Sequence, residues 1–290
     1  MIKISPHLRG ILITAAGVIM LSPDGLLVRL VAADSATILF WRGLFFGLAI
    51  FGFYFLRRGL GAVNLIRVMG RRGLIAAAFF SLSTCFFVLA ITHTTVANAL
   101  VIIATAPLFA AVFSWLVLKE PIPVATWMAI IVCIGGISLI FMGSLGGGSR
   151  QGDFYAILCA FMIAAQVTTV RHARTIDMVP SLGIAGLLTA LLALPFSAPL
   201  AVTGLGFAYL GVLGLLVLPL AFGLITVGPR YISAPEVSLL MLMESVLGPF
   251  WVWLVLNEVP DNETVLGGAI VISTLMVHTG HAYFKKRRPA

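Results

Sequence analysis

The hydrophobic positions of this 290-residue chain form long runs that short polar breaks separate. A run of roughly 20 residues, coiled as a helix, crosses a hydrocarbon layer of about 30 Å. Breaks at charged residues, prolines and glycine clusters divide the chain into ten predicted spans. They cover residues 10–31, 36–56, 73–92, 95–118, 124–143, 152–172, 181–201, 207–228, 234–256 and 263–284. The pattern predicts an all-α integral membrane protein whose short loops leave no room for a domain outside the bilayer.

Composition supports the same class. Hydrophobic residues make up 61% of the chain and charged residues 10%, whereas a soluble domain has about 25% charged residues. Three cysteines, at positions 85, 133 and 159, all lie inside apolar runs. Their odd number and spacing argue against a disulfide framework or a metal cluster, so they are interpreted as small buried thiols.

The positive charges predict how the chain is oriented. Fifteen of the 18 Lys and Arg residues lie at the N-terminus, after even-numbered spans or in the C-terminal tail; Arg29 and Arg150 fall on the other side, and Arg42 falls inside the second span. Because cytoplasmic loops are enriched in Lys and Arg, both termini are expected in the cytoplasm. The net charge of +8 is therefore assigned to membrane orientation, and no nucleic-acid partner is expected.

Two sequence echoes indicate a duplicated half. The segment beginning at Trp115 (WLVLKE) returns at Trp253 (WLVLNE), and Leu27-Val28-Arg29 resembles Thr169-Val170-Arg171. Both echoes are separated by about 140 residues, which is five predicted spans. Five is an odd number, so the two halves are expected to insert in opposite directions. The predicted units are 1–143 and 150–290, joined by a glycine-rich linker at 144–149.

Inverted halves are the architecture of alternating access, because a cavity between them opens first to one side and then to the other. The chain contains no GxxxxGK[ST] phosphate loop. Active transport would therefore depend on an ion gradient, a counter-substrate or the gradient of the substrate itself.

Several of these motifs together resemble the drug/metabolite transporter superfamily, in particular its EamA-type exporters. They are the W-x-x-x-x-E pattern that closes the fourth span of each half, Arg9-Gly10, Ser22-Pro23, Leu27-Val28-Arg29 and Phe40-Trp41-Arg42-Gly43. The resemblance implies a ten-helix basket with a central cavity in a bacterial inner membrane. Members of this group move amino acids, purines, cationic drugs and other small metabolites, generally outward.

Glu244, in the middle of the ninth span, is the first candidate for function. A charge near the bilayer centre costs at least about 2.5 kcal/mol, so it needs a reason. A cavity-facing Glu244 would meet a substrate ammonium or take up a proton as coupling ion. The structural alternative is a glutamate that ties helices together.

Asp24 and Arg42 form the second candidate. Asp24 follows Ser22-Pro23, where a proline and Gly25 would break the first span, and Arg42 lies at a similar depth in the second span. They are expected to form an ion pair, which satisfies two costly charges and would also serve as an outer gate.

Mixed polar and aromatic helix faces supply the remaining candidates for substrate contact. They are Asn98 and Phe109 in the fourth span, Tyr155 and Gln166 in the sixth, and Trp251 in the ninth. Small and polar residues also hold membrane helices together, so packing is the alternative. The Gly43-x-x-x-Gly47 pair is interpreted as a packing face.

The leading hypothesis is a secondary transporter that exports amino acids, aromatic or otherwise neutral, or similar small metabolites across a lipid bilayer. A multidrug exporter of lipophilic cations is the closest alternative. A non-transporting scaffold and an intramembrane enzyme are the alternatives from other classes; the sequence shows no nucleophile, base and metal set at membrane depth. No cofactor or metal is expected, and the oligomeric state stays open.

Overall fold

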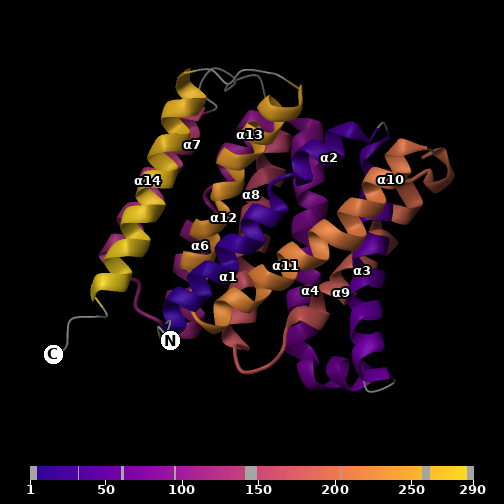
Figure 1. The fold of residues 1–290 in the computed structure, drawn as a ribbon, viewed down its shortest axis with the longest axis horizontal. Coiled ribbons are helices and arrows are strands. Elements are labelled where there is room, and N and C mark those ends of the chain that lie inside the picture. Colours follow the sequence, from indigo (N-terminus) through magenta and orange to yellow (C-terminus); the bar gives the residue numbers. More distant parts are fainter. Residues whose placement is uncertain are drawn as a thin grey trace.

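The computed structural model describes residues 5–31, 33–59, 62–94, 96–140, 149–202, 204–256 and 262–285, which form helices joined by short connections without a β-strand (Figure 1). The first half contains α1 (Pro6–Leu21), α2 (Asp24–Leu30), α3 (Ser35–Arg58), α4 (Ala62–His93), α5 (Val96–Ile103), α6 (Ala106–Phe113), η2 (Ser114–Leu118) and α7 (Val124–Ile140). The second half contains α8 (Arg150–His172), α9 (Val179–Ala193), η4 (Leu194–Phe196), η5 (Pro199–Ala201), α10 (Leu205–Val212), η6 (Leu213–Val217), α11 (Leu218–Val227), η7 (Gly228–Arg230), α12 (Ala234–Met241), α13 (Met243–Leu256) and α14 (Asn262–Lys285).

The all-helical membrane fold is confirmed. Within the described residues, seven helical stretches are long and apolar enough to cross a membrane, and two shorter apolar helices cover Val124–Leu139 and Val265–His278. The predicted ninth span, 234–256, is divided between α12 and α13. The total of ten spans stays a prediction, and most of the predicted linker lies outside the described residues.

The first, fourth and ninth predicted spans are interrupted helices. The first breaks at Ser22–Pro23, where the proline ring cannot continue the hydrogen-bond ladder. The fourth breaks before Ala106 and the ninth at Leu242, and at each break the backbone turns more tightly: Thr105 N donates to Ile102 O and Leu242 N to Leu239 O. The last two breaks lie in the same register of the repeat, eleven residues before Trp115 and Trp253.

Equivalent helices of the two halves run antiparallel where they pack. On α3 and α9, a Cβ placed on Gly43 would lie 2.7 Å from Gly186 O, and one placed on Gly186 would lie 2.7 Å from Gly43 O. Further along, Gly47 faces the Gly183 carbonyl, so the partner's numbers fall as those of α3 rise. Only glycine permits so close a backbone approach. The packing interpretation of Gly43 and Gly47 is confirmed.

The second equivalent pair, α7 and α14, forms one edge of the bundle (Figure 1). Thr126 Oγ1 lies 3.1 Å from His278 Nε2 at one end of the pair, and Gly136 packs on Gly267 and Val271 towards the other. This pair is therefore antiparallel as well. The two halves run in opposite directions through the bundle, as an inverted repeat requires.

The remaining long contacts repeat the same symmetry. Helix α4 packs antiparallel along α8, where Cys159 Sγ donates to Ser83 O at 3.3 Å, and α1 packs along α11, where Gly17 meets the carbonyl of Ala221. Each half thus contributes one helix to each of these contacts. The central hydrophobic core lies between them and includes Val18, Phe46 and Val167.

Large apolar side chains cover much of the outside of the bundle, including Leu191 and Ile131. Hydrocarbon chains are as apolar as a protein core, so such exposure is the expected state of a lipid-facing helix. Many helices are consequently apolar on every face.

Charged side chains join the two halves at the end where α1 begins. Arg171, on α8, donates from Nη2 to Glu120 Oε1 at 2.8 Å, from Nε to the same carboxylate, and from Nη1 to Pro229 O at 2.9 Å. Arg174 lies 3.6 Å from Glu120 and is mostly exposed. Glu120 thus holds the end of η2 against the second half.

Two further clusters lie at the same end. The Tyr54 hydroxyl donates to Asp177 Oδ2 at 2.7 Å, and Arg230 donates to Asp177 Oδ1 at 3.0 Å. His7 Nε2 lies 2.8 Å from Glu236 Oε1, and Glu236 also closes the N-terminal capping box of α12. We call the region of these three clusters the charged end.

At the opposite end the described contacts between halves use uncharged donors. Ala198 N donates to Thr37 Oγ1 at 2.8 Å, Trp41 Nε1 donates to Pro199 O at 2.9 Å, and Thr94 Oγ1 donates to Asp153 Oδ1 at 2.8 Å. Asp34, in the connection before α3, accepts the Thr37 hydroxyl and backbone N–H, and these hydrogen bonds hold the pKa of Asp34 below its usual value.

Candidate functional site

The break in the first span places Asp24 against Arg42. Asp24 opens α2 directly after Pro23 and is only 8% exposed. Arg42 projects from the second turn of α3 and donates from Nη2 to Asp24 Oδ2 at 2.5 Å. The structure thus brings these two residues together as a largely buried ion pair. Because each charge is costly in a membrane, the pair stabilises both side chains.

The second carboxylate oxygen of Asp24, Oδ1, does not take part in the ion pair with Arg42. Oδ1 is buried and has no hydrogen-bond partner within the described part of the protein. Buried polar atoms are nearly always satisfied, by protein or by water. An unsatisfied carboxylate oxygen beside a guanidinium is therefore a place for a hydrogen-bond donor that enters from outside.

Glu244 lies in the same neighbourhood. It stands in the first turn of α13, which packs against α1 and against α2, the helix that carries Asp24, and it is partly buried. No residue that the structure describes gives Glu244 a hydrogen bond. Two carboxylates and one guanidinium leave a deficit of one positive charge when all are ionised. A proton or a cationic group would remove that deficit.

Trp251 connects α13 to the break in the first span. Its indole Nε1 donates to Ser22 Oγ at 2.7 Å, and Ser22 Oγ donates in turn to Ile19 O. The predicted substrate-contact residue Trp251 therefore anchors the broken segment that carries Asp24. Its aromatic ring and Glu244 lie on the same helix, two turns apart.

The other predicted contact residues lie elsewhere. The ring of Phe109, on α6, contacts Phe161 of α8 at a centroid distance of 5.9 Å. Tyr155 lies near the start of α8, where its ring contacts Phe86 and its hydroxyl accepts from Gln151 Nε2 at 3.0 Å. Their described contacts do not include Asp24, Arg42 or Glu244.

Gln166 is buried on α8, which packs against α4, α6 and α12. The side chain of Asn98 lies outside the described residues. No hydrogen bond within the described residues joins Gln166 to Asp24 or Arg42.

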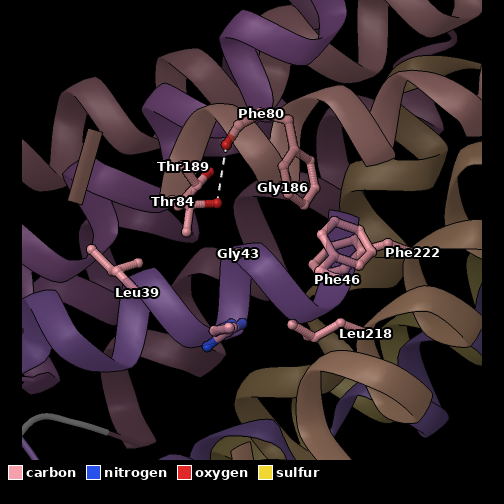
Figure 2. A pocket seen from close by; sticks show the side chains of 10 residues that line it. Leu39, Gly43, Phe46, Phe80, Thr84, Gly186, Thr189, Leu218 and Phe222 are labelled. Atoms are coloured by element: carbon pink, nitrogen blue, oxygen red, sulfur yellow. Dashed lines mark hydrogen bonds between the residues drawn. The ribbon is translucent and has the colours of Figure 1, made fainter. Parts of the chain in front are cut away.

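Arg42 also lines a small cavity between the helices (Figure 2). Two helices of each half surround it: α3 and α4 from the first, α9 and α11 from the second. Its volume is about 40 Å³, which holds roughly three water molecules. It lies beside the Gly43–Gly186 crossing, at the interface between the halves.

Three phenylalanines supply the apolar wall of this cavity, and we call them the phenylalanine cluster: Phe46, Phe80 and Phe222. The Phe80 and Phe222 rings meet edge to face at a centroid distance of 4.8 Å, and Phe46 lies 5.9 Å and 6.1 Å from them. In Figure 2 Phe46 and Phe222 lie side by side above Leu218. Thr84 and Thr189 add hydroxyl groups on another part of the wall.

Sequence reasoning missed the phenylalanine cluster. Phe46 follows Arg42 by one helical turn, so the two side chains share a face of α3, and this spacing was an available signal. Phe80 and Phe222 come from helices far apart in sequence, and nothing local marks them.

A metal site was not expected from the sequence. In the ranges that the structure describes, no group of three or more His, Cys, Asp and Glu side chains is placed to hold a metal ion.

These features define a multi-pass membrane transporter: a two-repeat helical bundle, with ionisable side chains buried at a helix break and a cavity between the halves. The EamA-like transporter family matches residues 8–142 and again residues 150–279. The chain belongs to this family, which confirms the resemblance and points to a transporter rather than an enzyme.

The relatives agree with this assignment. The chain is 26% identical over 211 residues to the pseudopaline exporter CntI of Pseudomonas aeruginosa strain UCBPP-PA14, covering 69% of this chain and 70% of that protein. It is 26% identical over 188 residues to the uncharacterized transporter YdfC of Bacillus subtilis, covering 60% and 59%. A solved crystal structure shares the fold with a TM-score of 0.83 at 17% identity, covering 98% of this chain and all of the other.

Proposed function

We propose that the protein exports amino acids, aromatic or otherwise neutral, or similar small amphipathic metabolites by alternating access. The observation that carries the proposal is the group of Asp24, Arg42 and Glu244, which lie together where α1 gives way to α2. Intramembrane ionisable residues mark substrate and ion pathways. The printed name of the Pseudomonas relative, an exporter, supports the outward direction.

Glu244 is proposed as the coupling residue. The three ionisable groups carry one negative charge too many when all are ionised, so one carboxylate is left to pair either with a proton or with the ammonium group of a substrate. If the two compete for Glu244, inward proton movement drives substrate outward. Asp24 and Arg42 are proposed to act as a gate beside Glu244. Their ion pair links the helix break of the first predicted span to the second predicted span.

The proposal is tested by counterflow and by a pH gradient in proteoliposomes. The liposomes are preloaded in turn with unlabelled amino acids, purines and a lipophilic cation, each against its labelled form outside. Glu244→Gln is expected to abolish pH-driven accumulation and to fold normally. Glu263→Gln, an exposed glutamate at the start of α14, is the matched control. Full pH-driven accumulation by Glu244→Gln would show that coupling lies elsewhere.

Export of lipophilic cations is the second candidate. It is favoured by one observation, the carboxylate of Glu244 on the same helix as the aromatic ring of Trp251, since aromatic faces and carboxylates attract cations. The same panel separates the two, because a cation exporter exchanges the lipophilic cation and not the amino acids. A non-transporting scaffold predicts no flux from either form.

We propose that both termini are cytoplasmic and that the protein resides in a bacterial inner membrane. The N-terminal end of α1 and the C-terminal end of α14 lie at the same side of the bundle (Figure 1), and most Lys and Arg residues are assigned to that side. The family match to two segments supports a junction of the halves at 144–149. A C-terminal fusion to a reporter active only in the cytoplasm tests the orientation.

A further inference from the structure

The connection between α3 and α4 carries an excess of positive charge. We call residues 57–72 the arginine segment, and its five arginines are Arg57, Arg58, Arg67, Arg71 and Arg72. All five side chains are exposed. The chain has no Asp or Glu between Asp34 and Glu120, so no neighbour in sequence offers these arginines a negative charge.

Two glycines shape the arginine segment. The helix α3 ends at Arg58, and Gly59 follows with a φ of 54°. Within α4, Gly70 has a φ of 54° and a ψ of −151° and bends the helix. Both values lie in the region that favours glycine. Residues 62–69 therefore form a short helical piece between two bends, at the lower edge of the bundle where α3 ends and α4 begins (Figure 1).

Met69 holds this piece against the second half of the protein. Its side chain is 2% exposed and belongs to a hydrophobic cluster with Val170, Ala173 and Met178. The arginine segment is thus packed on the bundle at the charged end, and its arginines remain on the surface.

Other arginines at the charged end have partners within the protein. Arg171 pairs with Glu120 and Arg230 with Asp177. Among the residues that the structure describes, no carboxylate forms an ion pair with an arginine of the arginine segment. Arg57 instead lies over the ring of Phe53, with its Cζ 5.0 Å from the ring centroid. The counter-charges for the segment must therefore come from outside the described protein.

Apolar side chains next to the arginines indicate where the segment lies. Phe55 and Leu56 are exposed in the last turn of α3, and Val68, Leu74 and Ile75 are exposed along α4. Exposed apolar residues of a membrane helix face the acyl chains. Arginines beside them extend towards the polar headgroups, because their charged ends leave the hydrocarbon. The segment therefore lies at the depth of the lipid phosphates.

We infer that the arginine segment binds the phosphate groups of anionic phospholipids in the adjoining leaflet. A guanidinium matches the geometry of a phosphate with two parallel hydrogen bonds. The proposed orientation places this end on the cytoplasmic side, where anionic lipids attract basic segments. The inference goes beyond the proposed function and is independent of the substrate.

The test measures lipid binding to the full-length protein, purified in an uncharged detergent. Tail-labelled phosphatidylglycerol and phosphatidylcholine are titrated separately in mixed micelles. Phosphatidylglycerol is expected to bind at least about tenfold more tightly, because each arginine near an anionic surface contributes about fivefold. This preference should shrink at about 0.5 M salt, which screens the charges. Equal affinity for the two lipids overturns the inference.

Variants locate the site. The double variant Arg71→Gln with Arg72→Gln is expected to reduce the preference for phosphatidylglycerol at least about fivefold. The matched double variant Arg71→Lys with Arg72→Lys retains both charges and should retain most of the preference. Arg174→Gln, at an exposed arginine near Glu120, is the control outside the segment and should change the preference less than about twofold. An unchanged preference in the double glutamine variant overturns the inference.

Two checks keep the comparison of variants decisive. The C-terminal reporter fusion and thermal unfolding show that each variant is inserted and folded like the unmodified protein. Should the double glutamine variant not fold, Arg57→Gln with Arg58→Gln, at the exposed end of α3, provides the same comparison.

Competitors separate a lipid from other anionic partners. Inorganic phosphate and polyglutamate are each added to protein that holds labelled phosphatidylglycerol. Retention of the lipid in the presence of both supports the inference. Displacement by inorganic phosphate would identify a soluble phosphate as the ligand, and tighter binding of polyglutamate would identify an acidic protein segment; either result overturns the assignment to lipid.

Discussion

The two ends of the bundle are joined in different ways. At the charged end, Glu120 with Arg171, Asp177 with Tyr54 and Arg230, and His7 with Glu236 hold the first half to the second. At the opposite end, the described contacts are hydrogen bonds from neutral hydroxyl, indole and backbone groups.

This difference has a mechanical consequence. Opening the charged end requires separating charged partners and rehydrating them, whereas opening the opposite end separates uncharged donors from their acceptors, of which only Asp153 carries a carboxylate. Buried ion pairs are strongly destabilised when one partner is removed, and neutral hydrogen bonds contribute about 1 kcal/mol each. The charged end is therefore expected to set the balance between inward-open and outward-open states.

The largest effect is expected from Arg171→Ala. It leaves the Glu120 carboxylate and the Pro229 carbonyl without their principal partner, and the free energy of unfolding should fall by about 2–3 kcal/mol. Thermal unfolding in detergent measures the loss. Arg174→Ala is the matched control, since its side chain is 54% exposed against 12% for Arg171, and should change stability by less than about 0.5 kcal/mol. Equal effects of the two variants would contradict the role given to Arg171.

The double variant Glu120→Arg with Arg171→Glu is expected to regain part of the stability that Arg171→Ala loses. The exchange preserves opposite charges across the halves, although the bond to Pro229 O is lost. A double-mutant cycle should give a coupling of about 1–2 kcal/mol. A coupling near zero would mean that Glu120 and Arg171 stabilise the protein independently.

Tyr54→Phe removes one neutral donor from a charged cluster. The Asp177 carboxylate keeps its bond to Arg230, so a loss of about 1 kcal/mol is expected. Accessibility of a cysteine introduced at the exposed Arg58 to a membrane-impermeant thiol reagent should also rise if the cluster restrains this end. An unchanged labelling rate would confine the role of Tyr54 to stability.

Trp41→Phe probes the opposite end and is expected to have the smallest effect. It removes the bond to Pro199 O, while the ring contacts with Phe45 and Phe207 are retained in kind. The free energy of unfolding should fall by at most about 1 kcal/mol, and this loss should not depend on the salt concentration. The effect of Arg171→Ala should shrink at about 1 M salt, because salt screens charges. If the loss of stability caused by Trp41→Phe depended on salt, the two ends of the bundle would not differ in the kind of contact that joins the halves.

The sequence predicted part of the candidate site from the type of each residue and from its position within a predicted membrane span. Arg42 and Asp24 were expected to meet because two charges inside apolar runs need partners, and Ser22-Pro23 marked the helix break. Arg171 was assigned to membrane orientation and to the sequence repeat, and its contact with Glu120 was not predicted, because the contact joins residues from different halves. Phe109 and Tyr155 were proposed as substrate contacts from the mixed polar and aromatic faces of their own spans, and their described ring contacts include Phe161 and Phe86.

The sequence by itself determined the membrane class, the helical runs and the repeat, because run length and charge are properties of neighbouring residues and the repeat is visible when the two halves of the sequence are compared. It did not determine which face of each helix points inward. Lipid is as apolar as the interior, so these helices carry little amphipathic contrast to mark the buried side. The tertiary structure decided this at close crossings such as Gly43 on Gly186, which rotate α3 so that Arg42 and Phe46 face the cavity together.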